Sequence, residues 1–237
     1  MSAEIWLPAA ALAVEACIGY PRALYARIAH PVVWIGKLIG ALEHRWNDPS
    51  RSEAARRALG FVTMTTVAGS AAAVGYAIQT SAQQLPFGIL IVVLVATVGL
   101  AQRSLYTHVR DVLRPLAGDD LPAAREAVSK IVGRDTTQLT PSGVAAAAVE
   151  SLAESFNDGI VAPAFWLAIG GLPGLFAYKA LNTADSLIGH REPRWRSFGW
   201  AAARADDLAN LIPARLAGLL IVLAGGGGLY GDRKSVV

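Results

Sequence analysis

The sequence has little charge, one cysteine and few histidines. Of its 237 residues, 16% are charged and 54% are hydrophobic, and the mean hydropathy is +0.41. The single cysteine, Cys17, excludes an internal disulfide and a cysteine-built metal site. It lies in an apolar run, which favours packing over nucleophilic chemistry, because burial disfavours the thiolate. The four histidines show no zinc spacing. This composition is typical of a chain embedded in a lipid bilayer.

Long uncharged runs predict an all-α, polytopic membrane protein. Residues 59–80 and 85–101 carry no charge and are close to the roughly 17–25 residues that a spanning helix needs, so they predict an out-and-back hairpin. The first basic residue, Arg22, follows the first apolar run, so residues 5–20 are interpreted as a retained span with Glu15 embedded rather than as a signal peptide. Residues 208–224 are the last predicted span.

Positive charges are gathered in three stretches and indicate topology rather than nucleic-acid binding. Seven Lys/Arg lie in residues 22–57, six in 103–134 and five in 179–204, whereas the connection 81–86 has none. By the positive-inside rule the three basic stretches face the cytoplasm. We therefore expect a multi-pass protein of the inner (cytoplasmic) membrane, with its polar motifs on the cytoplasmic side and no nucleic-acid partner.

The remaining segments predict helices of other kinds. In residues 32–46 apolar side chains recur at helical period with charged side chains on the opposite face. This pattern suits an amphipathic helix lying at the membrane interface. Residues 103–141 are the main polar segment, interpreted as a cytoplasmic loop with a helix over 121–132 after the cap Asp119-Asp120. Residues 143–156 predict an alanine-rich helix, and residues 160–178 hold too many prolines and glycines for a straight span. Since basic stretches flank it on the same side, residues 143–178 should enter and return as a re-entrant pair.

Acidic and amide side chains recur at helical spacing. Glu150 and Glu154 are one turn apart, and Asn157 and Asp158 extend the same face. Carboxylates on an apolar helix are costly in a bilayer and favour a functional role. The alternative is that both glutamates pair with Arg134 or Arg204 and only tie helices together.

Two further polar groups follow the broken segment. Lys179, Asn182 and Asp185 form one stripe, and Asp206, Asp207 and Asn210 form another beside Arg204. Hard oxygen ligands at these spacings suit a magnesium ion that bridges phosphates. For the second group the alternative is a helix N-terminal cap, and both roles are compatible. Arg134 and Asp135 lie in a Gly-Arg-Asp-Thr-Thr turn that suits an anionic group, although such a turn is more often only solvated.

Five ordered blocks closely resemble the adenosylcobinamide-phosphate synthase family of cobalamin biosynthesis, over about residues 15–223. They are His30-Pro31-Val32 with 35–39, Val132-Gly133-Arg134-Asp135-Thr136, residues 150–154 with 158–163, residues 178–186, and residues 198–216. Ser155 departs from the asparagine expected after Glu154. The resemblance implies an enzyme that joins 1-amino-2-propanol, or its O-phosphate, to the propionate carboxylate of adenosylcobyric acid as an amide. ATP with Mg²⁺ is the expected means of activation, although no Walker-type glycine loop is present.

The resemblance also implies candidate roles within this family. The catalytic candidates are Glu150, Glu154, Asp158, Asp185 and Asp207, and the metal candidates are Glu154, Asp158 and Asp206. Charge on the corrinoid or on the small amino alcohol would be bound by Arg134, Asp135, Lys179, Asn182 and Arg204. The sequence assigns no oligomeric state.

The family continues beyond the end of this chain, so residues 1–231 are expected to be one membrane-embedded synthase domain, truncated at its C-terminus. Residues 232–237 are expected to be an artefactual tail, because a reverse translation resembles a sequencing adapter.

Three other functions compete with the synthase. A membrane prenyltransferase would have two repeated aspartate motifs, which the spacing does not show. A non-catalytic regulator need not keep the acidic clusters, which this chain keeps. A corrinoid transporter is suggested by the broken segment.

Overall fold

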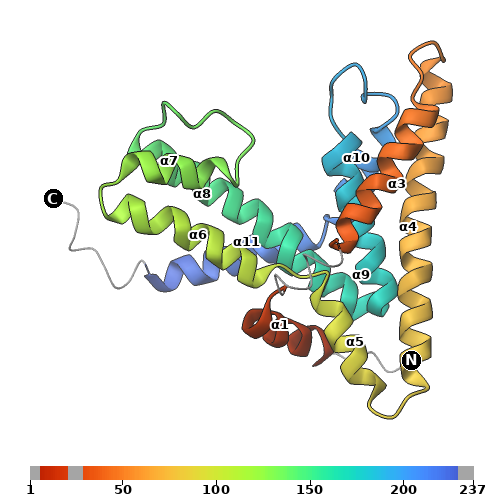
Figure 1. Cartoon of the computed structure of the whole chain (residues 1–237), viewed down its shortest axis with the longest axis horizontal. Helices are drawn as coiled ribbons and strands as arrows, with labels where there is room; N and C mark the ends of the chain where they lie inside the picture. Colours follow the sequence, from red (N-terminus) through yellow and green to blue (C-terminus); the bar gives the residue numbers. More distant parts are fainter. Residues whose placement is uncertain (1–5, 21–28, 229–237) are drawn as a thin grey trace.

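The computed structural model describes residues 6–20 and 29–228, and in this part of the chain every regular element is helical. One long helix, α4, forms an edge of the molecule, further helices pack along one side of it, and a side arm of shorter helices extends away from it (Figure 1). The elements are α1 (Trp6–Ile18), α3 (Pro31–Trp46), α4 (Glu53–Gln83), α5 (Gly88–Thr97), α6 (Gln102–Ala117), α7 (Leu121–Ser129), α8 (Pro141–Phe156), the π-helix η1 (Asn157–Val161), α9 (Ala162–Ile188), α10 (Trp200–Ala209) and α11 (Pro213–Gly228).

Helix α4 is the main predicted span, and it is longer than the sequence indicated. Its 31 residues extend for about 46 Å at 1.5 Å per residue, more than the roughly 30 Å of a bilayer core. Ser52 caps its first turn by accepting from the amide of Ala55. Three described helical stretches are long and apolar enough to cross a membrane, or four if the bent pair α10–α11 is one span. The chain is therefore a multi-pass membrane protein.

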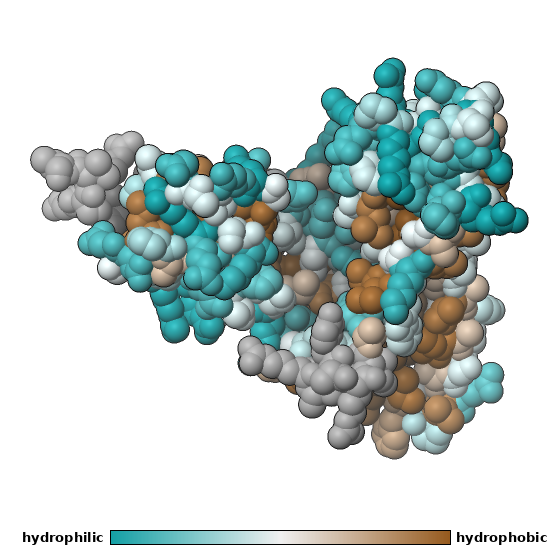
Figure 2. All heavy atoms as spheres, turned by 45° about the horizontal axis from the view of Figure 1, so that its top comes forward, coloured by the Kyte–Doolittle hydropathy of each residue, from teal (hydrophilic) through white to brown (hydrophobic). Residues whose placement is uncertain are grey.

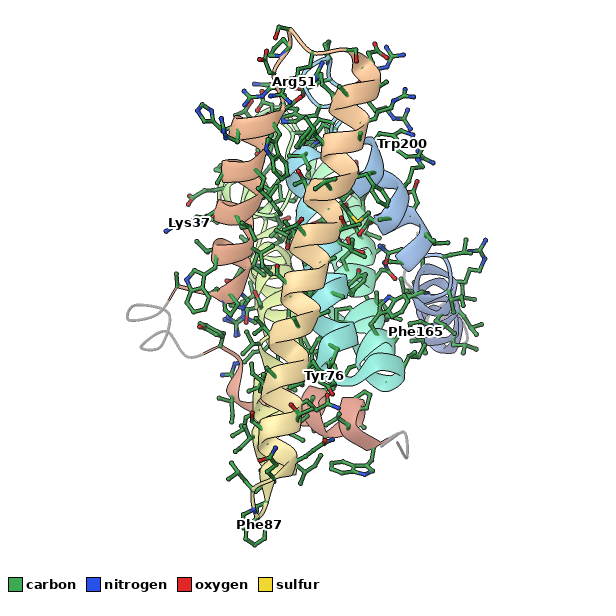
Figure 3. All side chains as sticks on the ribbon, turned by 90° about the vertical axis from the view of Figure 1, so that its right-hand side faces the viewer. Lys37, Arg51, Tyr76, Phe87, Phe165 and Trp200 are labelled. Atoms are coloured by element: carbon green, nitrogen blue, oxygen red, sulfur yellow. The ribbon has the colours of Figure 1, made fainter. Side chains whose placement is uncertain are left out.

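The two ends of α4 differ in polarity. Arg51 lies at one end and Phe87 at the other (Figure 3). The connection between α9 and α10 also lies at the end near Arg51, where Arg194 contacts Glu43. Hydrophilic residues gather at this end, whereas hydrophobic residues lie along the part of the molecule below it (Figure 2). This brings two of the three basic stretches together, as predicted. Their orientation toward the cytoplasm stays a prediction.

The first apolar run forms a shorter helix than predicted. Helix α1 has 13 residues, about 20 Å, and so falls short of a bilayer core. The expectation of a full span over residues 5–20 is therefore not supported by the described part. Glu15 is buried, as expected, and its carboxylate accepts from the backbone N–H of Arg103 at 3.0 Å. Cys17 is exposed, which corrects the predicted packing role.

The polar segment after α5 is not a loop, and that prediction was wrong. The predicted span over residues 85–101 begins with the ten-residue α5, and α6 follows from Gln102; together they form Gly88–Ala117, one of the three candidate spans. Helix α6 places Val112 against Ala124 and Val128 of α7 and Val144 of α8, a cluster that forms the side arm. The apolar positions of α6 recur every three or four residues among many charges, which hides them from a mean-hydropathy argument. Helix α7 begins after Asp120, which caps it as predicted.

The predicted re-entrant pair is confirmed by the reversal inside α9. Gly171 has φ +61° and ψ −151°, outside the helical region, and Pro173 follows it. The Nδ2 atom of Asn182 lies 3.0 Å from Oδ2 of Asp158. In a straight helix those residues would be about 36 Å apart. The second half of α9 therefore folds back along η1 and the first half.

Helices α3, α10 and α11 complete the fold. The amphipathic segment forms α3, as predicted, with His30 as its N-cap. It lies lengthwise beside α4 and contacts α9, whereas a helix at the membrane interface was expected to lie across the end of the spanning helices (Figure 3). Ile39 is its fully buried residue, packed with Val67 and Ala184. The last predicted span, residues 208–224, corresponds mainly to α11, which begins at Pro213 and is bent by 50° from α10. The expected tail, residues 232–237, lies outside the described residues.

Candidate functional site

A closed network of polar side chains forms where η1, the second half of α9 and the end of α10 meet. Asp158 on η1 accepts from Asn182 of α9 at 3.0 Å, and the same amide group lies 3.5 Å from Oδ1 of Asp206 on α10. Asn182 thus bridges two carboxylates from different elements. Asp158 and Asp206 are separated by 48 positions in the sequence, and it is the reversal at Gly171 that brings α9 between them.

Two asparagines close the other side of the network. Asn210 donates to Oδ2 of Asp206 at 2.9 Å, and its own Oδ1 accepts from Asn157 at 2.8 Å. Asn157 also donates to Oδ1 of Asp158 at 2.7 Å. The ring therefore runs from Asp158 through Asn182, Asp206, Asn210 and Asn157 back to Asp158. We call these five residues the polar ring.

Tyr178 and Lys179 connect the polar ring to the interior. The hydroxyl of buried Tyr178 donates to Asn210 at 3.1 Å and lies 3.4 Å from Asp158. Lys179 donates from Nζ to the backbone carbonyl of Asp158 at 3.2 Å. This carbonyl belongs to the π-helix, whose wider turn leaves backbone groups without the usual α-helical partner. Lys179 thus places a positive charge beside two carboxylates.

Breaks in the helices give the site its shape. The π-helical turn starts at Asn157, and α10 ends with Asn210 as its C-cap, so both asparagines lie at the terminus of an element. Ala101, in the break between α5 and α6, donates its N–H to the carbonyl of Gly159 at 3.0 Å. Trp166 of α9 donates to the carbonyl of Ala209 at 3.1 Å. Irregular backbone of this kind is tolerated in a membrane protein where it lines a polar cavity.

The predicted residues nearest to the polar ring are Asp185, Asp207 and Arg204. Asp185 is half-buried one turn after Asn182, close enough to Asp207 and Asp158 for electrostatic interaction. Asp207 is exposed and forms an ion pair with Arg204 at 3.0 Å on the same helix. This pair borders the polar ring and is open to solvent.

The other predicted residues lie along the side arm. Glu150 pairs with Arg134, so the alternative that this pair ties α8 to the preceding loop fits the structure. Asp135 accepts from the N–H and the hydroxyl of Thr137 at 2.9 and 2.8 Å, and these hydrogen bonds hold its pKa below the ordinary value. Glu154 is exposed between this pair and Asp158, without a hydrogen bond or ion pair to any described residue.

Comparison with known proteins decides the family. A family model described as CobD/Cbib protein matches residues 8–235. The chain belongs to the CobD/CbiB family. It is 51% identical over 214 residues to "Cobalamin biosynthesis protein CobD" of Rhodobacter capsulatus, covering 90% of this chain and 67% of the relative. It is 48% identical over 223 residues to the protein of the same name from Rhizobium meliloti, covering 93% and 68%. No solved structure matches the chain.

This membership places the chain in cobalamin biosynthesis and confirms the family resemblance. The chain spans about two thirds of the length of these CobD relatives. The predicted roles of individual residues stay predictions.

The polar ring has the chemistry for a hard cation, although the predicted metal set is not assembled as such. No group of three His, Cys, Asp or Glu side chains in the described residues is placed to hold a metal. Glu154 stands apart from Asp158 and Asp206. Magnesium in proteins is commonly held by one or two carboxylates together with substrate phosphates and water. Asp158 and Asp206 meet that description, and Asn157 Oδ1 is a buried oxygen without a hydrogen-bond partner among the described residues. The residues present therefore fit Mg²⁺.

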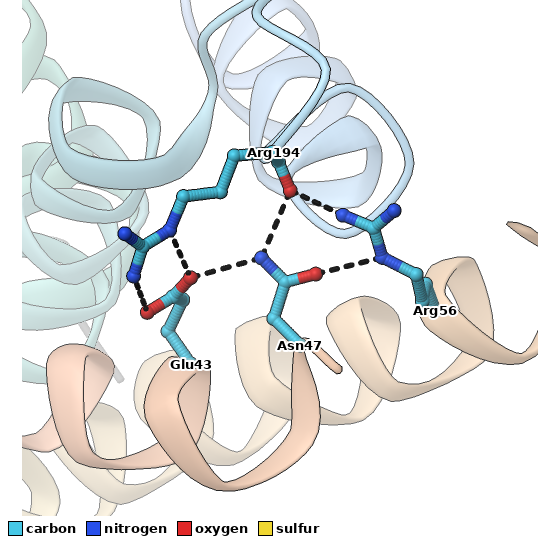
Figure 4. Close-up of polar contacts among 4 residues, drawn as sticks. All are labelled: Glu43, Asn47, Arg56 and Arg194. Carbon is cyan, nitrogen blue, oxygen red and sulfur yellow. Dashed lines mark hydrogen bonds and ion pairs between the residues drawn. The ribbon is translucent and has the colours of Figure 1, made fainter. Parts of the chain in front are cut away.

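A second network in this CobD/CbiB chain joins the connection between α9 and α10 to the corner between α3 and α4 (Figure 4). Arg194 donates from Nε and Nη2 to the two carboxylate oxygens of buried Glu43, at 3.0 and 2.9 Å. Asn47 donates to Glu43 and to the carbonyl of Arg194, both at 2.9 Å, and accepts from Arg56 at 2.8 Å. Burial of Glu43 opposes ionisation, but the hydrogen bonds and charge of Arg194 hold its pKa below the ordinary value.

Sequence reasoning did not select several of these residues. Tyr178 had no signal beyond its place before Lys179. Asn157 and Asn210 were grouped with the neighbouring acids as oxygen-bearing side chains but were not selected as site residues. The partnership of Glu43 and Arg194 spans 151 positions and has no local signal. Two groupings did mark hydrogen-bonded partners beforehand: Asn157 with Asp158, and Asn210 with Asp206 four residues earlier.

Proposed function

We propose that this chain catalyses amide-bond formation between 1-amino-2-propanol, or its O-phosphate, and the propionate carboxylate of adenosylcobyric acid, with the polar ring as the reaction site. Its membership of the CobD/CbiB family supports the pathway. The observation that carries the site is the bridge through Asn182, which holds the Asp158 and Asp206 carboxylates together on separate elements.

The site offers complementary charges for two substrates. An amino alcohol arrives as an ammonium ion, and the carboxylates of Asp185 and Asp207 at the border of the polar ring are suited to bind it. Lys179 supplies the opposite charge for a propionate or a phosphate group. Holding both reactants in one site lowers the entropic cost of bringing them together.

A proton must leave the ammonium before the nitrogen can attack. In the balanced reaction the new N–C bond forms as the C–O bond to the leaving group of the activated carboxyl breaks and that group departs. The ammonium nitrogen gives up two of its three protons and keeps one as the amide N–H. Asp185 and Asp207 border the polar ring and belong to the proposed bases, since a carboxylate within hydrogen-bond reach can accept that proton. Arg204, paired with Asp207 at 3.0 Å, would orient that carboxylate.

Mg²⁺ with ATP is the proposed source of carboxylate activation, since amide formation from a carboxylate in water is uphill. Asp158 and Asp206 would hold the ion, with Asn157 Oδ1 as a further oxygen ligand. The same residues orient each other through the polar ring, so loss of one is expected to disturb the others.

A direct assay tests the proposal. Membranes containing the chain would be incubated with adenosylcobyric acid, labelled aminopropanol or its phosphate, ATP and Mg²⁺, and the corrinoid products separated by chromatography. Asp158→Asn and Asp206→Asn are expected to reduce the rate at least 100-fold, while Glu126→Gln, an exposed acid of α7, leaves it within twofold.

The R. capsulatus relative, with the equivalent substitutions, serves as the parallel enzyme. Amide product from both wild-type proteins, lost with the aspartate variants, would support the reaction and the site together. If both aspartate variants still form product, the proposed reaction is supported and the polar ring is not its site. Inserted proteins that form no product would overturn the reaction and favour transport or regulation.

A further inference from the structure

An apolar groove runs between α3 and α4, closed from behind by α5 and α9. Its volume is about 360 Å³, within the range of small-molecule pockets. Its walls include Trp34, Leu38, Val67, Val74, Ile78 and Phe176. We call it the α3–α4 groove. It is separate from the polar ring, with Lys179 lying between the two.

Three polar side chains around this groove, those of Ser70, Lys179 and His30, are already hydrogen-bonded to protein. Ser70 donates to the carbonyl of Val67 at 3.0 Å, and Lys179 donates to the carbonyl of Asp158 at 3.2 Å. His30 accepts from the amide of Val32 through Nδ1 at 3.3 Å, and burial together with the charge of Lys179 keeps its pKa below the ordinary value. A sugar, nucleotide or corrin amide would thus lose its hydrogen bonds to water here without replacement, at about 1–3 kcal/mol for each group.

The dimensions favour a chain-like ligand. The groove follows α4 from Val67 to Ile78, a length of about 16 Å at 1.5 Å per residue. Val67 is 1% exposed and forms part of the floor, whereas Trp34 and Val74 at the rim are each 53% exposed. The groove is thus open along one side, in the middle of a helix that is long and apolar enough to span a membrane.

The surroundings of the opening identify the source of that chain. The rim opens on the side of α4, a helix long and apolar enough to span a membrane. At that position the surrounding solvent is lipid hydrocarbon.

We propose that the α3–α4 groove binds one acyl chain of a membrane phospholipid, with its hydrocarbon between α3 and α4 and its end against Phe176. The proposal rests on the membrane-spanning character of the chain and not on the proposed reaction. Since the stem of Lys179 and Phe176 line the same groove, the bound acyl chain would pack directly behind the polar ring.

Photolabelling tests the proposal. The intact chain is reconstituted into nanodiscs of phosphatidylethanolamine and phosphatidylglycerol that contain a small fraction of phospholipid with a diazirine near the end of one acyl chain. After irradiation, labelled peptides are mapped by mass spectrometry. Label is expected on residues 67–78 and 95–99 of the groove, and also on the exposed apolar face of α11.

Filling the groove distinguishes a binding site from general lipid contact. Ala71→Trp, which places a large side chain inside, is expected to reduce groove labelling at least fivefold and to leave α11 labelling unchanged. Val74→Trp at the exposed rim is a second variant that does not disturb the packed floor. Val62→Trp, at a 44% exposed position of α4 outside the groove, is the matched control.

The outcomes are distinct. Loss of groove label in Ala71→Trp and Val74→Trp, but not in Val62→Trp, supports the acyl-chain site. Groove labelling that neither tryptophan reduces overturns it, because the label then reports only general exposure. A groove that stays unlabelled while α11 is labelled also overturns it and assigns the space to protein, from this chain or a second copy.

Discussion

Gln79 of α4 accepts a hydrogen bond through Oε1 from the backbone N–H of Leu172, at 2.8 Å. Leu172 directly follows Gly171, the reversal point of α9, so its N–H begins a new helical turn and has no acceptor within that helix. Leu172 is fully buried. Inside a bilayer an unpaired backbone group is costly, so the side chain of Gln79 supplies what the turn lacks. Helix α4 thus stabilises the reversal of α9, and this reversal assembles the polar ring.

Gln79→Leu is expected to lower the free energy of unfolding by about 1–3 kcal/mol, because it leaves the buried Leu172 N–H unpaired. The measurement is unfolding by SDS in mixed micelles, followed by circular dichroism. Gln83→Leu, an exposed glutamine one turn later, is the matched control and should change stability by less than about 0.5 kcal/mol. Equal effects of the two substitutions would show that the hydrogen bond is not important for stability.

Gly60 marks the closest approach of α4 to the segment before α10. A Cβ added there would lie 1.8 Å from the carbonyl oxygen of Phe198, so the backbone would have to shift. Gly60→Ala is expected to destabilise the protein by about 1–3 kcal/mol. Gly69 on the same helix has no atom within 4 Å of its added Cβ, so Gly69→Ala should be neutral or stabilising by up to about 1 kcal/mol. Thermal unfolding in detergent compares them, and an unaffected Gly60→Ala protein would contradict the close packing.

Much of the fold was predictable because its signals are local. Uncharged runs indicated α4, the cap at Asp120 indicated α7, and Gly171 with Pro173 indicated a broken segment. The misses have physical causes. Helix α6 carries its apolar stripe among many charges, so average polarity suggested a loop. Helix α1 was predicted from hydrophobicity alone, which does not fix helix length.

The candidate site was only partly predictable, because spacing along one helix does not show which helices meet. Asp158, Lys179, Asn182 and Asp206 were each visible as polar residues on apolar helices, and the reversal of α9 brings them together. The same reasoning grouped Glu150 with Asp158, since both lie on one face. It raised the pairing of Glu150 with Arg134 only as an alternative, and it could not decide that alternative, because the contact depends on how the loop that holds Arg134 packs against α8.

Stability should depend on the ionisation of Glu43. Its pKa in the folded protein is lower than in the unfolded chain, so its contribution is fully present above the unfolded value of about 4.5. That contribution is lost as the pH falls through the folded pKa, which lies lower still. Wild type is therefore expected to melt at a higher temperature than Glu43→Gln at pH 7, with the difference shrinking below about pH 4.5.

The measurement is the melting temperature of both proteins from pH 3 to pH 8. Glu53→Gln, an exposed acid at the start of α4, is the control and should give a difference that is small at every pH. A difference between wild type and Glu43→Gln that is constant across the range would show that the charge of Glu43 is unimportant for the network in Figure 4.

Glu150 offers the sharpest choice between the catalytic and the structural interpretation. Its ion pair with Arg134 is open to water, with side-chain exposures of 69% and 52%, and such pairs contribute about 0–1 kcal/mol. Glu150→Gln and Arg134→Gln should therefore each lower stability by less than about 1 kcal/mol. In the amide-forming assay Glu150→Gln should retain at least a third of the wild-type rate, whereas Asp158→Asn, two turns along the same face, loses at least 100-fold. If Glu150→Gln instead loses activity as severely as Asp158→Asn while remaining folded, Glu150 acts in the reaction, and the site must extend along α8 from the polar ring to the side arm.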